Sequence, residues 1–401
     1  MIKAAIFGYG TVGSGVYEVL TKNSAIIQNK LGDRIEVKYV LDLRDFEGDP
    51  VQQVLVHDVD TILNDEDVKI ICETMGGEKP AYDFTRRALE LGKSVCTSNK
   101  ELVEKHGAEL LEIAKEHNCS YLFEASVGGG IPIIRPLCTS LAQEHIESIT
   151  GILNGTTNYI LSKMENEGAD FDTVLKRAQE KGYAERNPEA DVCGYDAGRK
   201  IAILASLAYG KNVDFADLYI EGITQISKTD FEYAGKLGTT IKLFAKSLCR
   251  DGKYYAMVAP FMVTQDNPLY AVQNVFNAIL VHGNMVGDTM YYGKGAGKLA
   301  TASAVVADVI DCAKHLGKHI PIIWDEQKLE ISPMDEFTRR FFVRVKETDH
   351  NKIRENFGDV EFIEHVADGE TGFITAEMTE KAYNECAAKA GNVINRIRFE
   401  S

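Results

Sequence analysis

The order of secondary-structure patterns predicts an α/β protein built from three parts. Over the first third of the 401 residues, short apolar segments alternate with helical ones, which is typical of a Rossmann-type doubly wound parallel sheet. The middle mixes helical patterns with alternating segments such as YYAMVAPFMV, which suits a second α+β domain whose sheet is covered on one face. The end of the chain follows the order strand–helix–strand–strand–helix–strand, which predicts a small ferredoxin-like (βαββαβ) module.

A glycine-rich loop near the start of the chain is the first segment with chemical meaning. It reads GYGTVG at residues 8–13, after the apolar run at residues 3–7 and before a helical pattern that extends to Leu20. The first glycine permits a tight turn, the second lets the backbone approach a pyrophosphate and the third lets the helix pack closely. The helix N-terminus then faces the phosphates, so the motif predicts NAD or NADP binding. The loop residues expected to contact the cofactor are Gly8, Tyr9, Gly10, Thr11, Val12 and Gly13.

Two charged residues after the second predicted strand, residues 35–41, bear on the choice of dinucleotide. Asp42 would suit a free ribose hydroxyl and hence NAD, whereas Arg44 would suit a 2′-phosphate and hence NADP. Both residues are present, so the local sequence does not decide between NAD and NADP. On the strength of Arg44 we expect a preference for NADPH, with NADH also used.

Polar residues follow the ends of further predicted strands in the same domain. Thr74, Lys100 and Glu124 each come just after a short apolar segment, as Gly8 does. In doubly wound sheets, ligands bind outside the carboxyl ends of the strands. These residues are therefore expected to line one crevice.

The composition excludes several classes of function. A net charge of −16 argues against a nucleic-acid surface, and no apolar stretch approaches the length of a membrane span. The N-terminus starts directly on a strand, without a charged and then apolar leader. The eight cysteines are scattered and form no CxxC pair, so buried free thiols are the default. We expect a cytoplasmic protein with reduced thiols and with neither nucleic acid nor membrane as a partner.

A charged, turn-rich stretch at residues 178–200 is a poor core element. It contains Glu185, Asp191, Asp196 and Lys200, and it leads into an apolar helical run. Asp196 and Lys200 are four residues apart and share a helix face. The carboxylates could hold a cationic amino group while the lysine moves a proton. The alternative is a solvated loop with one surface ion pair.

Together with other motifs, this stretch resembles the homoserine dehydrogenase family over nearly the whole chain. The glycine loop and Ser98-Asn99-Lys100 fit the family. So do EASVGGGIP, GILNGTTNYI and GKGAGKLATASAVVAD at residues 124–132, 151–160 and 293–308. The most specific match is GYAERNPEADVCGYDAGRK at residues 182–200. The resemblance implies NAD(P)-dependent interconversion of L-aspartate 4-semialdehyde and L-homoserine, a step in threonine, methionine and isoleucine biosynthesis.

The resemblance also implies a role for each charged residue of the site. Lys200 looks like the catalytic acid/base, and its ordinary pKa near 10.4 means that burial or a nearby cation must help it. Lys100, the second catalytic candidate, would contact the reacting oxygen and lie beside the nicotinamide. Glu185 and Asp196 would hold the substrate ammonium, with Asp191 as an orienting carboxylate.

Further contacts follow from the same resemblance. Thr156 and the Gly182 backbone look like groups that position the substrate, although a plain helix cap is the alternative for Thr156. Beyond the glycine loop, the residues expected to contact the cofactor are Arg44, Thr74, Ser98, Lys100 and Gly297.

A monovalent cation site is also implied. By resemblance, Glu124 and the backbone carbonyls of Val127, Gly129 and Ile131 hold an ion, often sodium, and oxygen ligands suit such a hard ion. The alternative is simply a tight turn. No histidine or cysteine cluster in the sequence supports zinc.

The terminal module resembles an ACT domain, which in relatives often binds a regulatory amino acid. Regulatory ACT domains usually carry an Asp-x-Pro-Gly-like turn after the first strand, whereas residues 346–351 read KETDHN. We therefore expect this module to contribute to assembly of a homo-oligomer, a dimer or tetramer, rather than to feedback by threonine.

The predicted domain boundaries follow from these motifs. Residues 1–133 would form the dinucleotide-binding domain, completed by residues 293–320. Residues 134–292 would form the substrate-binding, catalytic and dimerisation domain. A linker at residues 321–335 would lead to the ACT-like module at residues 336–401.

Two other functions stay open on the residues alone. A semialdehyde dehydrogenase that oxidises the aldehyde needs a cysteine nucleophile near a base. Cys193 lies in the central stretch, but no histidine is near it in sequence. A dinucleotide-sensing binding protein would keep the glycine loop without needing both Lys100 and Lys200.

Overall fold

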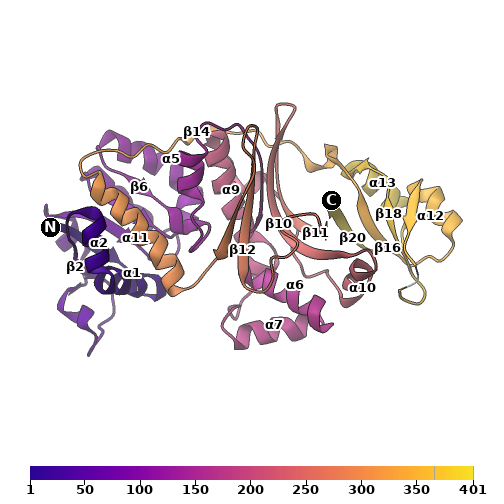
Figure 1. Cartoon of the computed structure of the whole chain (residues 1–401), viewed down its shortest axis with the longest axis horizontal. Coiled ribbons are helices and arrows are strands. Elements are labelled where there is room, and N and C mark those ends of the chain that lie inside the picture. Colours follow the sequence, from indigo (N-terminus) through magenta and orange to yellow (C-terminus); the bar gives the residue numbers. More distant parts are fainter. Residues whose placement is uncertain (365, 401) are drawn as a thin grey trace. The chain divides into compact units, whose positions relative to one another are not determined.

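The computed structural model describes residues 1–364 and 366–400 (Figure 1). Contacts between Cα atoms divide the chain into two compact units. The first comprises Met1–Glu144, Ala202–Asp214 and Tyr291–Leu329. The second comprises His145–Ile201, Phe215–Met290 and Glu330–Ser401. Within the described residues, no helix has the length and apolar character that crossing a membrane would require.

A six-stranded parallel sheet in the order β3-β2-β1-β4-β5-β6 forms the centre of the first unit. Its strands are β1 (Ile2–Phe7), β2 (Ile35–Leu41), β3 (Leu55–Val56), β4 (Val68–Glu73), β5 (Ser94–Thr97) and β6 (Tyr121–Leu122). Phe7 pairs with both Leu41 and Glu73, and Glu73 pairs with Thr97. The carboxyl ends of four strands are therefore level, which sets the loops after them side by side.

The helices of the first unit pack around this sheet, as a doubly wound fold requires. They are α1 (Thr11–Lys22), α2 (Ser24–Leu31), α3 (Val59–Leu63), α4 (Ala81–Glu90), α5 (Lys100–Glu116) and α11 (Lys298–Lys314). Helix α11 returns from late in the sequence to lie against α1 (Figure 1). The two helices come so close that a Cβ added to Gly15 would lie 2.8 Å from the carbonyl oxygen of Lys298. The predicted α/β class with a parallel Rossmann-type sheet is confirmed.

A long mixed sheet dominates the second unit, in the order β13-β12-β7-β10-β11-β20-β16-β18-β17, with β9 paired to β11. Its strands are β7 (Ile146–Ile152), β9 (Tyr219–Ile220), β10 (Thr239–Arg250), β11 (Lys253–Thr264), β12 (Phe276–Gly283), β13 (Gly287–Lys294), β16 (Phe341–Val345), β17 (Val360–Phe362), β18 (Thr371–Thr375) and β20 (Val393–Glu400). Two short pairs complete the strands: β8 (Lys211–Asn212) with β14 (Asp325–Lys328) in the first unit, and β15 (Thr338–Arg339) with β19 (Met378–Thr379) in the second.

The predicted order at the end of the chain is present as β16, α12 (His350–Phe357), β17, β18, α13 (Glu380–Ala390) and β20. The last strand joins this module to the rest of the sheet, because Arg398 pairs with Phe261 of β11 and with Phe341 of β16. The terminal module therefore continues the main sheet of the second unit.

The remaining helices are α6 (Gly155–Glu167), α7 (Phe171–Glu180), α8 (Glu189–Val192), α9 (Tyr195–Tyr209) and α10 (Lys228–Lys236). Helix α6 begins where β7 ends, and its cap is Asn154, whose side chain accepts a hydrogen bond from the Thr157 N–H at 2.8 Å. Helix α9 follows the charged central stretch and brings Asp196 and Lys200 into the second unit.

Candidate active site

The loops at the carboxyl ends of β1, β2 and β4 surround a pocket of about 530 Å³ in the first unit. Gly8, Gly10, Arg44 and Thr74 line it, so the structure brings these four predicted cofactor residues together. The Thr74 hydroxyl donates to the Gly8 carbonyl at 2.8 Å and fixes the glycine loop. A Cβ on Gly13 would lie 1.9 Å from the Gly8 carbonyl oxygen, whereas a Cβ on Gly10 would meet nothing within 4 Å. The third glycine is therefore packed tightly against the loop backbone, whereas the second glycine has open space beside it. That open space fits a pyrophosphate.

The other predicted cofactor residues lie in the same unit and differ in their burial and in the element that carries them. Thr11 begins α1 and is exposed, and Val12 packs against the core. The Tyr9 ring is buried, and burial raises its pKa to about 12. Ser98 and Lys100 follow β5, and Gly297 precedes α11 with a φ of 127°.

Asp42 and Arg44 both line this pocket and form an ion pair with each other. Arg44 donates to Asp42 through Nε and Nη2, each at 3.0 Å, and the Tyr9 N–H donates to the same carboxylate at 2.8 Å. The Arg44 guanidinium lowers the pKa of Asp42 to about 2, so the carboxylate is ionised at neutral pH. The His57 Nδ1 lies 2.7 Å from the Asp42 carbonyl oxygen, and His57 also lines the pocket. Sequence reasoning missed His57 because nothing local marks it.

A second buried group supports the loop that carries Lys100. Glu73 is fully buried at the end of β4 and accepts hydrogen bonds from the Thr97 hydroxyl and the Met75 N–H. Thr97 in turn accepts from the Asn99 N–H at 2.9 Å. Burial raises the pKa of Glu73 to about 7. Glu73 was not among the predicted site residues, since a carboxyl inside an apolar core gives no local signal.

Lys200 and Asp196 are buried side chains of α9 in the second unit, with exposed fractions of 8% and 4%. The Lys200 ammonium donates to Asp196 Oδ2 at 2.7 Å and to the Leu153 carbonyl at 2.9 Å. The alternative of a solvated surface ion pair is therefore wrong. A buried ion pair is retained only where its remaining polar groups are satisfied, and here the end of β7 supplies the carbonyl.

Asn154 joins this pair to a second carboxylate. Its amide nitrogen donates to Asp191 Oδ1 at 2.7 Å and to Asp196 Oδ2 at 2.9 Å, while its oxygen caps α6. We call Asn154, Asp191, Asp196 and Lys200 the carboxylate–lysine cluster. The cluster brings two carboxylates beside one ammonium, and carboxylate oxygens can accept hydrogen bonds from a cationic ligand group. Asn154 was not among the predicted site residues, although its place before Gly155 marks it as a cap.

The loop between α7 and α8 holds the remaining predicted substrate residues. The Thr156 hydroxyl donates to the Tyr183 carbonyl at 2.6 Å and ties α6 to this loop. The cap of α6 is Asn154, so the plain-cap alternative for Thr156 is wrong. Gly182 has a φ of 72°, which suits glycine, and Glu185 is exposed on the same loop.

Glu124 is buried and organises the turn that follows it. Its carboxylate accepts hydrogen bonds from the N–H groups of Ile133, Ile134 and Arg135 at 2.6, 2.9 and 2.8 Å. The turn needs its glycines, because a Cβ on Gly128 would lie 2.4 Å from the Ile131 carbonyl oxygen. Carboxylate and carbonyl oxygens are the donors that fit a hard monovalent cation. Among the described residues there is no group of three or more His, Cys, Asp or Glu side chains placed to hold a metal ion.

Comparison with known proteins decides the family. A model of the homoserine dehydrogenase family matches residues 132–310, and a model of the homoserine dehydrogenase NAD-binding domain matches residues 8–124. The chain belongs to the homoserine dehydrogenase family. It is an NAD(P)-dependent oxidoreductase that interconverts L-aspartate 4-semialdehyde and L-homoserine. This assignment decides against the acyl-enzyme alternative at Cys193 and against the pure binding protein.

Homoserine dehydrogenases of known sequence and structure align over most of the chain. The Synechocystis enzyme is 42% identical over 360 residues, which cover 86% of this chain and 82% of that one. The Bacillus subtilis enzyme is 41% identical over 319 residues, covering 79% and 73%. The crystal structure of the Thiobacillus denitrificans enzyme is 34% identical, covers 100% and 98% of the two chains and has a TM-score of 0.89. A hyperthermophilic archaeal homoserine dehydrogenase in complex with NADPH is 28% identical, covers 80% and 99%, and has a TM-score of 0.67.

Proposed function

We propose that the carboxylate–lysine cluster binds the amino acid substrate and moves the proton of the reaction, with Lys200 as the acid/base. In the reductive direction NADPH supplies a hydride to the aldehyde carbon. The developing alkoxide needs a proton, and the Lys200 ammonium donates it. The observation that carries this proposal is the burial of the Lys200 ammonium 2.7 Å from Asp196. Burial fixes the ammonium in one place and strengthens its effect on developing charge.

The two carboxylates of the cluster support the proposed substrate contacts. Asp196 and Glu185 hold the substrate ammonium, and Asp191 orients it through Asn154. Thr156 and the Gly182 backbone position the substrate from the loop that they share. In the oxidative direction the same lysine receives the proton of the homoserine hydroxyl.

Lys100 is proposed to stabilise the reacting oxygen from the nicotinamide side. It is the first residue of α5, directly after the loop that Glu73 and Thr97 support. Thr74, Ser98 and Gly297, together with the glycine loop, are proposed to hold the dinucleotide. Since Arg44 lines that pocket, we propose a preference for NADPH.

Two further features are proposals of the same kind. Glu124 and the carbonyls of Val127, Gly129 and Ile131 hold a monovalent cation. Titrating sodium into protein that was desalted in a tetramethylammonium buffer tests this site.

The enzyme is a cytoplasmic homo-oligomer in which the ACT-like module contributes to assembly and does not respond to threonine. Clear saturable inhibition by threonine would contradict that last point.

The cofactor part is tested by comparing kcat/KM for NADPH and NADH with L-aspartate 4-semialdehyde as substrate. The expected result is a higher value for NADPH, which Arg44→Ala lowers while NADH use is retained. Arg86→Ala is a matched control, because Arg86 is an exposed arginine of α4 paired with Glu90. A strong preference for NADH in the wild-type enzyme would overturn the assignment.

A further inference from the structure

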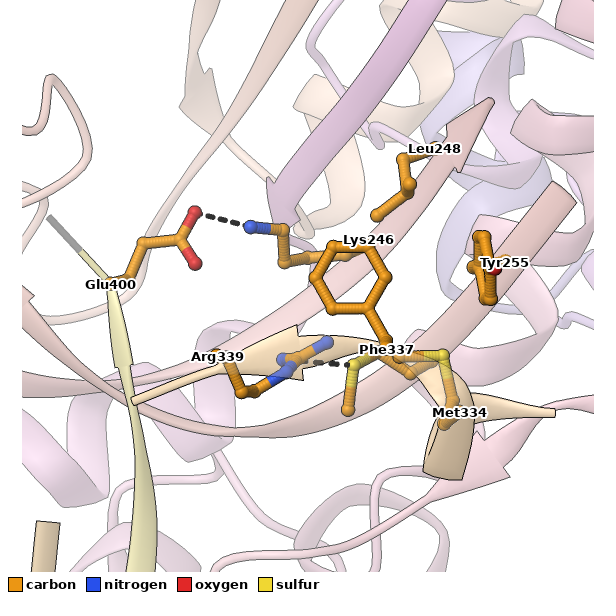
Figure 2. Close-up of a pocket in the computed structure, with 8 residues that line it drawn as sticks. Lys246, Leu248, Tyr255, Met334, Phe337, Arg339 and Glu400 are labelled. Carbon is orange, nitrogen blue, oxygen red and sulfur yellow. Dashed lines mark hydrogen bonds and ion pairs between the residues drawn. The ribbon is translucent and has the colours of Figure 1, made fainter. Parts of the chain in front are cut away.

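A small cavity lies in the second unit, between β10, β11 and the segment that leads into the terminal module (Figure 2). Its free volume is about 50 Å³, several times the ~10–15 Å³ that one water molecule needs. Most of its wall is apolar and consists of Leu248, Tyr255, Met257, Met334 and Phe337. None of the residues that line it belongs to the dinucleotide pocket or to the carboxylate–lysine cluster.

Three charged side chains also line this cavity: Lys246, Arg339 and Glu400. The Lys246 ammonium is paired with the Glu400 carboxylate, as Figure 2 shows. Two positive charges and one negative charge leave one positive charge in excess. Lys246 and Glu400 offset each other. Arg339 lies 3.7 Å from the Glu380 carboxylate, but Arg396 and Arg398 pair with that carboxylate too, so the excess charge lies on the Arg339 side of the cavity.

The Arg339 guanidinium is buried and lacks adequate acceptors among the described residues. Arg339 is 9% exposed, and its Nε has no hydrogen-bond partner in residues 1–364 and 366–400. The Glu380 Oε1 atom is 3.7 Å from Nε, close enough for an ion pair but too far for a hydrogen bond. Nη1 donates to the Met257 sulfur at 3.6 Å, which is a weak acceptor. Glu380 is already held by Arg398 through bonds of 2.6 and 2.8 Å.

Aromatic rings fix the guanidinium in this position. Its carbon lies 4.6 Å from the centre of the Phe337 ring and 5.6 Å from that of Phe261. Stacking of this kind stabilises the cation but leaves its N–H groups unused. Consistent with this setting, burial lowers the pKa of Arg339 to about 10. A buried donor that lacks an acceptor is costly, so an anion that enters the cavity would be stabilised.

We propose that this cavity binds a small organic carboxylate of about two to four carbons, with its oxygens on Arg339 and its short tail on the apolar wall. The planar fork of a guanidinium matches the two oxygens of a carboxylate. The single excess positive charge matches one negative charge. An inorganic phosphate fits less well, because its remaining oxygens would face Leu248 and Phe337 without hydrogen bonds.

The probe for the test is 13C-labelled propionate, titrated into the full-length enzyme and followed by NMR line broadening. We expect saturable binding to the wild-type enzyme and at least tenfold weaker binding to Arg339→Met, which keeps an unbranched apolar stem but removes the guanidinium and its charge. Arg340→Met is the matched control, because the neighbouring Arg340 pairs with Glu361 at 2.7 Å and does not line the cavity. That variant should bind propionate as the wild type does.

A second variant keeps the test decisive if Arg339→Met does not fold. Leu248→Phe leaves every charge in place and adds bulk to the cavity wall, so it should also weaken propionate binding at least tenfold. No saturable binding to the wild-type enzyme would overturn the proposal. Propionate binding that is undiminished in folded Arg339→Met, or in Leu248→Phe, would also overturn the proposal. Inorganic phosphate that binds as well as propionate would overturn the assignment of an apolar tail.

Discussion

At the scale of single residues, the site depends on charged groups removed from water. Lys200 and Asp196 are paired inside the second unit, and Glu73 is fully buried in the first. Each is held by hydrogen bonds to neighbouring backbone or side chains. Such groups respond to substitution far more than surface charges do, because their charged forms are not solvated.

Glu73 should make folding stability depend on pH. Burial raises its pKa to about 7 in the folded protein, from 4.5. Between these values the folded state binds a proton that the unfolded state has lost, so the contribution of Glu73 to stability falls as pH rises. Across that range the contribution should fall by roughly 3 kcal/mol.

Urea unfolding of the wild type and of Glu73→Gln at several pH values measures this contribution. Glutamine resembles the protonated acid, so the variant should gain stability relative to the wild type as pH rises from about 4.5 to 7. A difference between the two proteins that stays constant over this range would show that Glu73 does not titrate there.

At the scale of elements, the charged loop before α9 is held by close backbone packing. Gly222 lies against it, since a Cβ there would be 2.1 Å from the Val192 carbonyl oxygen. The Ile223 N–H donates to the same carbonyl at 2.9 Å. This contact fixes the segment between Asp191 and Asp196, and therefore the geometry of the carboxylate–lysine cluster.

Gly222→Ala should displace that segment and lower kcat for homoserine oxidation by about tenfold to a hundredfold, because small misplacements of reacting groups are costly. NADPH affinity, measured by fluorescence titration, should be unchanged. Gly235→Ala is the control, because a Cβ there would meet nothing within 4 Å and α10 should gain stability. Wild-type turnover in Gly222→Ala would remove the positioning role of this contact.

The sequence predicted those parts of the site that depend on local geometry. The glycine loop was recognisable because turn, backbone approach and helix start lie within residues 8–13. The spacing of Asp196 and Lys200 likewise put them on one helix face. Their burial could not be predicted, because it depends on Leu153 and Asn154, which β7 and α6 bring to α9 from more than 40 residues away.

At the scale of the whole molecule, the terminal module is bound to the second unit by its last strand. Arg398 of β20 is fully buried and bonds Glu380 of α13 and, at 2.7 Å, Glu221 beside β9. No local pattern indicated this network, because it joins residues up to 177 positions apart. The predicted strand order of the module was correct, but its place in the main sheet was not foreseen.

Arg398→Met should therefore destabilise the second unit strongly. It removes the fully buried partner of Glu380 and Glu221, which then share, among the described residues, Arg396 alone at hydrogen-bond distance. Breaking a buried pair in this way costs about 3–5 kcal/mol. Arg250→Met is the control, because the exposed Arg250 is 3.9 Å from Asp251 and should contribute under about 1 kcal/mol. Equal urea midpoints for the two variants would contradict the structural importance of the network.

The central claim is that Lys200 moves the proton, and Lys200→Arg tests it most directly. Arginine keeps a positive charge beside the buried Asp196, so the fold and NADPH binding should be retained. Its guanidinium does not release a proton at working pH. At saturating NADPH and aspartate semialdehyde, kcat should fall about a hundredfold or more, the range for loss of a positioned proton-transfer group. Turnover close to that of the wild-type enzyme would contradict the assignment and leave Lys100 as the candidate.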